Sequence, residues 1–135
     1  MISRRMWVSG IAVAGLLAII GCGSPAGPAN PVSGRVLING KPASGVYLSF
    51  RPVANALAAP DAARTNEDGD FRLQAKFKGP AVITAFWPAI QIEGSDVIEG
   101  KDRFRGKYFD PQHPAATATI RGGDNLLPDL QLKTP

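Results

Sequence analysis

The sequence predicts an all-β fold, a single Greek-key sandwich of about seven strands. Three observations lead to this fold class. Short apolar or alternating runs recur along the chain, and clusters of Gly, Pro, Asn and Asp separate them. No segment after Cys22 has the apolar periodicity of an amphipathic helix. Cys22 is the only cysteine, so the fold must rely on an apolar core without an internal disulfide.

The first half of the domain contains two strand patterns joined by a turn. Residues 33–38 are β-branched and aliphatic, which predicts a strand. Asn39-Gly40 follows, a dipeptide that favours the positive φ angles of a two-residue hairpin turn. Residues 46–51 alternate apolar and polar side chains, as a half-buried strand does, and Pro52 ends them. Residues 53–64 are rich in alanine without a clear apolar face, so we expect a loop there.

Two further strands follow a polar turn. The turn is expected over residues 65–70, and residues 71–75 then alternate as a strand. Residues 78–80 form another turn. Residues 81–87 are almost continuously apolar, which predicts a central strand buried on both faces or nearly so.

The last third has weaker patterns. Residues 88–100 are expected to form a variable loop or a frayed hairpin, and residues 104–114 an aromatic and proline-rich crossing. Residues 115–120 alternate Ala and Thr before a final Ile, as a strand would. Residues 126–132 form the last strand, which Pro128 confines to an edge or delays, because proline cannot donate to a sheet ladder.

The first residues form a leader typical of exported proteins. Two arginines precede an apolar run over residues 6–20, which is shorter than the roughly 20 residues of a spanning helix. At its end, Ile19-Ile20-Gly21-Cys22 resembles the lipobox of bacterial lipoproteins. In that family the cysteine sulfur receives a diacylglycerol and a peptidase cuts before the cysteine. The resemblance implies a signal peptide over residues 1–21 and acyl chains, such as palmitate, on Cys22.

This anchor predicts where the protein works. One acyl chain binds a membrane only marginally, whereas two or more hold firmly, so Cys22 is expected to attach the chain to a bacterial membrane. Gly23 stands where an aspartate would favour retention at the inner membrane, which favours an outer membrane or the cell surface. Residues 22–31 are Gly, Ser, Pro, Ala and Asn after the cysteine, a flexible tether. Residues 32–135 form the domain.

Four segments of the domain together resemble the carboxypeptidase regulatory-like domain, a transthyretin-like sandwich. They are Val32-Ser33-Gly34-Arg35-Val36, residues 39–50 from Asn39-Gly40-Lys41 to Leu48-Ser49-Phe50, residues 65–73 around Asp68-Gly69-Asp70, and residues 79–85 from Gly79-Pro80. Residues 107–132 are similar to the ending of bacterial lipoproteins that carry such a domain. The resemblance implies a fold, while residues 88–100 depart from it by lengthening a connection. Zinc-peptidase motifs are absent, so it does not imply peptidase activity.

The distribution of basic residues along the chain predicts no nucleic-acid partner. The formal net charge of +4 includes the two arginines that leave with the signal peptide. A nucleic-acid site needs clustered basic residues with interleaved aromatics. Residues 101–108 are the nearest candidate, but the segment is short and Asp102 interrupts it. We expect a solvated surface there, with contact to anionic headgroups or acidic glycans as the alternative.

Two polar segments contain residue types that could form a metal or catalytic site. Asn66, Asp68 and Asp70 carry oxygens at alternate positions around a glycine, which is similar to a calcium loop. The glycine comes at the fourth position rather than the sixth, and the twelfth position lacks the bidentate Glu, so a plain turn is expected. His113, the only histidine, has no nucleophile or orienting acid in a recognisable motif, so a surface loop is expected. We predict no catalytic residue, no metal and no cofactor.

Trp87 and Tyr108 remain as candidate ligand contacts. If both lay on one exposed face they could stack on sugar rings, and the alternative is packing in the core. The sequence therefore predicts a non-enzymatic, lipid-anchored cell-envelope protein, whose sandwich contacts an envelope protein or a polysaccharide. A purely structural envelope role is the first alternative, and an enzyme the second.

Overall fold

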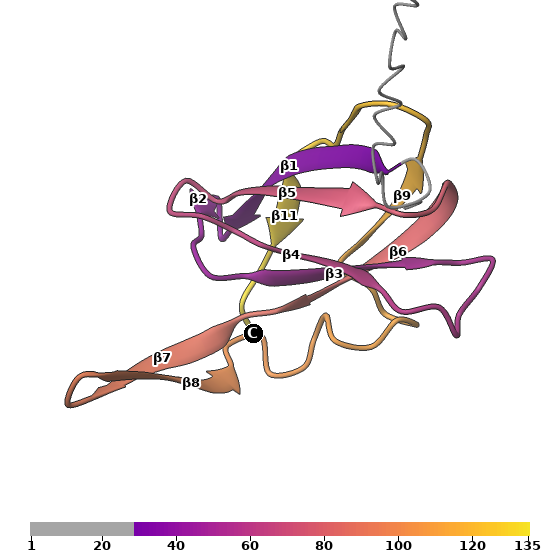
Figure 1. The fold of residues 1–135 in the computed structure, drawn as a ribbon. Coiled ribbons are helices and arrows are strands. Elements are labelled where there is room, and N and C mark those ends of the chain that lie inside the picture. Colours follow the sequence, from indigo (N-terminus) through magenta and orange to yellow (C-terminus); the bar gives the residue numbers. More distant parts are fainter. Residues whose placement is uncertain (1–28) are drawn as a thin grey trace, which may run out of the picture.

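The first of two packed sheets is built around β1 (Asn30–Ile38). This sheet belongs to a computed structural model that describes residues 29–135. On one edge β1 pairs antiparallel with β5 (Asp70–Ala75) and, at its end, with β2 (Lys41–Pro42). It also pairs parallel with β10 (Asn125–Leu126) and β11 (Leu130–Leu132). β1 is therefore the central strand of its sheet (Figure 1).

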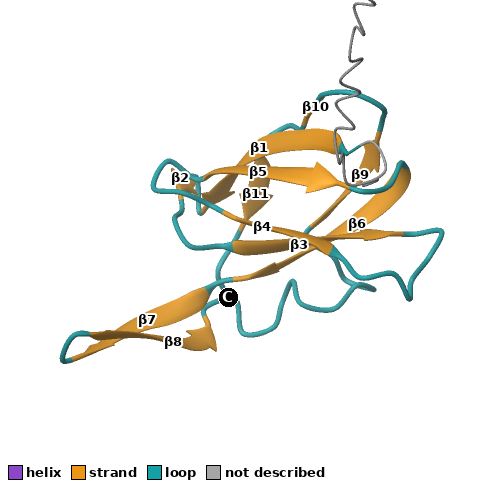
Figure 2. Ribbon diagram, viewed as in Figure 1, coloured by secondary structure: helices purple, strands orange, loops and turns teal. Residues whose placement is uncertain are grey.

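The second sheet is antiparallel throughout. Its strand order is β4 (Asp61–Arg64), β3 (Tyr47–Pro52), β6 (Gly79–Phe86) and β9 (Ala116–Ile120). The two sheets form the two layers of a sandwich (Figure 2). The chain crosses between the sheets several times, for example between β4 and β5.

A two-stranded hairpin extends from the sandwich where β6 ends. It consists of β7 (Pro88–Glu93) and β8 (Asp96–Asp102), which pair only with each other. Figure 1 shows the hairpin projecting beyond the edges of both sheets. A hairpin of two strands is marginally stable by itself in water, so its root must be fixed by the domain.

The core lies between the two sheets, where every second side chain of each strand points inward. Phe50 of β3 and Phe71 of β5 meet across the layers with ring centroids 5.9 Å apart. Phe104, which lies in the loop after β8, is also fully buried. Each such side chain contributes about 1.5–3 kcal/mol through burial, so this layer supplies most of the stabilisation.

The predicted fold class is confirmed: the described residues are all-β and contain no helix. The sandwich has a five-stranded and a four-stranded sheet, which makes eight strand positions when β10 and β11 are taken as one interrupted strand, against about seven predicted. The Asn39-Gly40 turn has the expected positive φ angles, 53° and 81°. None of the described residues belongs to a helix that could span a membrane. The predicted signal peptide and Cys22 lie outside the described residues.

Several boundaries differ from those predicted. β1 begins at Asn30 rather than residue 33, because the Asn30 side chain is buried and hydrogen-bonded, so the last predicted tether residues belong to the sheet. The segment expected to be a loop over residues 53–64 contains β4, an edge strand of two alanines between two charged residues, which lacks an apolar pattern. The last predicted strand divides around Pro128 into β10 and β11.

β6 is central, as predicted, but it is buried on one face only. Ala81, Ile83 and Ala85 point into the core, whereas the alternate side chains on the outer face are partly exposed. No second layer covers that outer face among the described residues. The nearly continuous apolar run over residues 81–87 thus predicted burial of both faces, whereas only one face is buried.

Candidate functional site

The β7–β8 hairpin concentrates exposed aliphatic side chains. Eight large hydrophobic residues are exposed among the described residues, and four of them lie on this hairpin. Ile92 is 74% exposed and Val97 66%, and the two face each other directly across the strands. Ile90 and Ile98 are exposed to 43% and 39%. Contiguous exposed apolar residues of this kind mark interaction surfaces.

The hairpin register follows from its turn. Glu93 pairs with Asp96, which leaves Gly94 and Ser95 as a two-residue loop. Gly94 has a φ of 65°, which suits the first position of a type II′ turn. Ile92 and Val97 lie directly opposite each other and therefore share a face, and Ile90 lies on that face because it is two residues from Ile92. We call these three residues the aliphatic face.

Glu99 ties this face to the second sheet. It lies opposite Ile90, and its carboxylate accepts a hydrogen bond of 2.6 Å from the Tyr47 hydroxyl. The guanidinium of Arg64 lies 3.5 Å from the same carboxylate. The hydrogen bond to Glu99 raises the pKa of Tyr47 above its ordinary value, helped by partial desolvation. These contacts orient the aliphatic face on the same side as the outer surface of the sheet.

Asp102 closes the root of the hairpin. Its Oδ1 accepts hydrogen bonds from the backbone N–H groups of Trp87, at 2.9 Å, and Phe104, at 3.0 Å. Its Oδ2 accepts another from Gly106 at 3.0 Å. Three backbone donors that would otherwise be unpaired at this corner are therefore satisfied by one carboxylate. The residue that interrupts the basic segment 101–108 is thus a structural cap.

Trp87 and Tyr108, the predicted ligand contacts, both pack against Phe104. Their ring centroids lie 5.6 Å and 5.0 Å from that of Phe104. Each polar end is also engaged, because the Trp87 indole N–H donates to the Ser44 carbonyl and the Tyr108 hydroxyl accepts from the Lys133 N–H. The two residues thus form an aromatic support beneath the hairpin root.

A cleft of about 600 Å³ lies beside Trp87. Lys41 and Arg103 also line it, and the Arg103 guanidinium lies 4.4 Å from the centre of the indole ring. Tyr108 is not part of its wall. The structure therefore does not join Trp87 and Tyr108 into one stacking platform, but it does bring Trp87 and two cations to one cleft.

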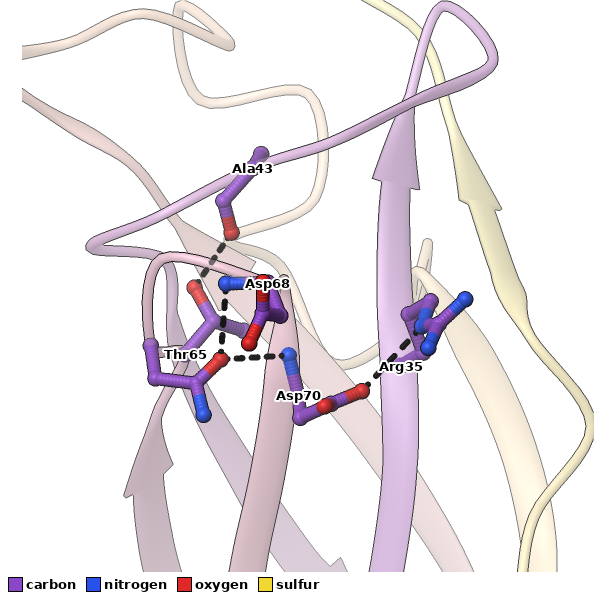
Figure 3. A network of polar contacts seen from close by, with 6 residues as sticks. Arg35, Ala43, Thr65, Asp68 and Asp70 are labelled. Carbon is purple, nitrogen blue, oxygen red and sulfur yellow. Dashed lines mark hydrogen bonds and ion pairs between the residues drawn. The ribbon is translucent and has the colours of Figure 1, made fainter.

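The acidic turn before β5 uses its oxygens internally, as Figure 3 shows. Asn66 Oδ1 accepts hydrogen bonds from the N–H groups of Asp68 and Asp70, both at 3.0 Å. Asp70 Oδ1 lies 3.1 Å from Nε of Arg35. These bonds confirm the predicted turn, and residues 29–135 contain no group of three potential metal ligands.

His113 lies on the surface, as predicted. Its Nδ1 is 3.4 Å from Asp110 Oδ2, and its side chain is 79% exposed. The pKa of Asp110 is lowered, first by the hydrogen bond from the Gln112 N–H and then by the one from His113. No serine, threonine or lysine contacts this pair in the described part of the chain, so the arrangement is a local turn.

A second cleft, of about 500 Å³, opens between β9 and the segment from β10 to β11. Small and aliphatic side chains line most of it, among them Ala116, Ala118 and Leu127. It holds no cluster of acid, base and nucleophile.

The aliphatic face was not predicted from the sequence. A signal was present, because two short alternating runs flank Gly94-Ser95 at the spacing of a hairpin. What the sequence could not show is that this hairpin leaves the sandwich and so exposes its apolar side chains.

No family model matches the chain, and no curated protein does. Solved structures with a similar fold include a DUF3823 family protein from Bacteroides ovatus ATCC 8483, with a TM-score of 0.47 and 14% identity. That alignment covers 76% of this chain and 44% of the other. A DUF3823 family protein from Parabacteroides merdae ATCC 43184 has a TM-score of 0.46 and 18% identity, with coverages of 80% and 47%.

The dioxygenase domain of a dioxygenase and carbohydrate-binding fusion from Streptomyces sp. SirexAA-E is also similar. Its TM-score is 0.43 and its identity 20%, over 84% of this chain and 85% of that domain. The present chain spans less than half the length of the two DUF3823 proteins. Membership of the carboxypeptidase regulatory-like family and the absence of catalysis both stay predictions.

Proposed function

We propose that this chain is an exported cell-envelope protein, anchored to a bacterial membrane by lipid on Cys22, whose non-catalytic sandwich binds another envelope protein. The observation that carries the proposal is the aliphatic face of the β7–β8 hairpin. It exposes Ile92 and Val97 to solvent on an element that contributes little to the core. Exposed aliphatic side chains favour a protein surface as the partner, because burying them gains about 25 cal/mol per Å².

The position of the hairpin supports this role. Chain residues leading from the proposed anchor enter the sandwich at Asn30, the start of β1. Figure 1 shows the hairpin at the opposite end of the sandwich from this entry point. The aliphatic face thus lies at the end of the sandwich distant from Asn30 (Figure 1). A purely structural envelope protein has no need of such a face, and this favours the binding role.

Photo-crosslinking in living cells tests the proposal. A benzophenone amino acid at position 92 should form covalent adducts with another envelope protein. The matched control is Leu57, which is 98% exposed but lies in the loop between β3 and β4, at the other end of the second sheet. Adducts from position 92 and not from position 57 are expected. Absence of protein adducts at position 92 would refute the protein-binding role.

An acidic polysaccharide in the cleft beside Trp87 is the second candidate. Lys41 and Arg103 supply positive charge there, and the indole supplies an aromatic surface. A bound sugar would have to displace Arg103 from the ring, which disfavours this candidate. Trp87 is the only tryptophan after the predicted cleavage site, so intrinsic fluorescence reports on the cleft directly. Unchanged fluorescence on titration with acidic envelope polysaccharide would reject this candidate.

A further inference from the structure

The tip of the hairpin combines its aliphatic side chains with unpaired negative charge. Ile92 faces Val97, and the next pair toward the turn is Glu93 opposite Asp96. All four of these side chains are exposed. Because side chains alternate along a strand, Glu93 and Asp96 point to the opposite face of the hairpin from Ile92 and Val97. The tip therefore presents an apolar pair on one face and an acidic pair on the other, with nothing basic on either strand between residues 89 and 100.

The acids of the hairpin divide into two groups by their contacts. Toward the root, Glu99 binds Tyr47 and Arg64, and Asp102 binds backbone N–H groups. Toward the tip, Glu93 and Asp96 form no ion pair or side-chain hydrogen bond within residues 29–135. The root acids are thus used to hold the hairpin, and the tip acids are free for an external contact.

Both features of the tip destabilise the isolated hairpin. Like charges directly opposite each other on adjacent strands repel. Exposed Ile and Val side chains lose the gain that burial would bring. One kind of partner surface relieves both: a cleft that encloses the tip, apolar where Ile92 and Val97 enter and with lysine or arginine where Glu93 and Asp96 lie on the opposite face. Interfaces commonly have this arrangement, with an apolar centre and a polar rim.

We infer that the hairpin tip docks into an apolar cleft of a partner protein that presents basic side chains beside it, with Glu93 and Asp96 selecting that partner by charge. This inference rests on the proposed role of the hairpin as a protein contact. Anionic membrane surfaces are disfavoured by the same two acids, which would be repelled by anionic headgroups. Charge at an interface rim acts mainly on partner choice and association rate.

The test compares three versions of the full-length protein, each with the photo-crosslinking residue at position 92. The first is otherwise wild type, and the second carries Glu93→Gln and Asp96→Asn. The third is a matched control with Asp124→Asn and Asp129→Asn, which removes two exposed acids next to β10 and β11 of the first sheet, whereas the hairpin extends from the second. Melting temperatures should agree in all three, since none of these acids lies in the core.

The expected result is a loss of about fivefold in adduct yield for the Glu93 and Asp96 variant, from two exposed charge pairs. The control should match wild type, and mass spectrometry should place the adduct on a partner peptide close to Lys or Arg. Equal yields in all three versions would overturn the charge selection while leaving protein binding intact. Adducts to a second copy of this chain or to lipid would overturn the inference as well. An absence of adducts in every version would overturn the proposed function itself.

Discussion

Thr65 offers a sharp test of how polar contacts hold the end of the sandwich from which the hairpin extends. Its hydroxyl donates to the Ala43 carbonyl at 2.7 Å (Figure 3). The same oxygen accepts from the Val46 N–H at 2.9 Å. The residue is only 4% exposed, so water cannot replace these bonds. Thr65→Val keeps the shape and leaves two buried backbone groups unpaired. Each unpaired group costs about 1–3 kcal/mol, so the variant should lose about 3 kcal/mol of unfolding free energy.

Thermal unfolding measures this loss. For a domain of this size, about 3 kcal/mol corresponds to a fall of roughly 12 °C in melting temperature. Thr65→Ser is the matched control, because it keeps the hydroxyl and loses one methyl group, at about 1 kcal/mol. The more polar variant should therefore be the more stable one. A Thr65→Val protein that melts at or above the Thr65→Ser protein would refute the reasoning.

Three other predictions concern the hairpin contact, the domain start and the anchor. The hydrogen bond to Glu99 raises the pKa of Tyr47, so this bond should stabilise the fold fully below the ordinary tyrosine pKa and be lost as the pH rises through the raised pKa. Glu99→Gln should therefore shift the absorbance titration of Tyr47 to lower pH. An unchanged titration would contradict the assignment. A chain that begins at Val32 should have a free energy of unfolding about 1–3 kcal/mol lower than a chain that begins at Asn30, because it lacks the hydrogen bonds from the Asn30 side chain to the Ala75 and Phe77 carbonyls. Equal free energies of unfolding in urea would argue against this. Labelled palmitate should enter the wild-type protein and not Cys22→Ala, so equal labelling would exclude the lipid anchor.

The strands were predictable where local pattern and burial agree. Residues 46–51 and 71–75 alternate because one face of each strand meets the core, and the structure places β3 and β5 there. The Asn39-Gly40 turn was equally predictable, since few residues adopt its two positive φ angles without strain. β4 was not, because its two alanines between charged residues give no apolar pattern and its pairing with β3 depends on the whole sheet.

The polar contacts that fix the hairpin could not be read from the sequence. Asp102 bonds to Trp87, and Thr65 to Ala43, across separations that no local motif marks. The same holds for Trp87 and Tyr108, whose common neighbour Phe104 lies in a segment predicted only as a crossing. An aromatic residue in a sequence indicates large contact area, but tertiary packing decides whether that area faces a ligand or the core.

The most direct test of the account changes the aliphatic face and measures binding and stability in the same protein. The variant carries Ile92→Ser and Val97→Ser, with the photo-crosslinking residue at position 90 on the same face. Its melting temperature should stay within about 2 °C of wild type, because surface substitutions of this kind change stability little. Adduct formation should fall more than about tenfold, because truncating the centre of an interface removes most of its binding energy. Undiminished adduct yield, or a fall in melting temperature as large as that expected for Thr65→Val, would contradict the proposed role of the hairpin.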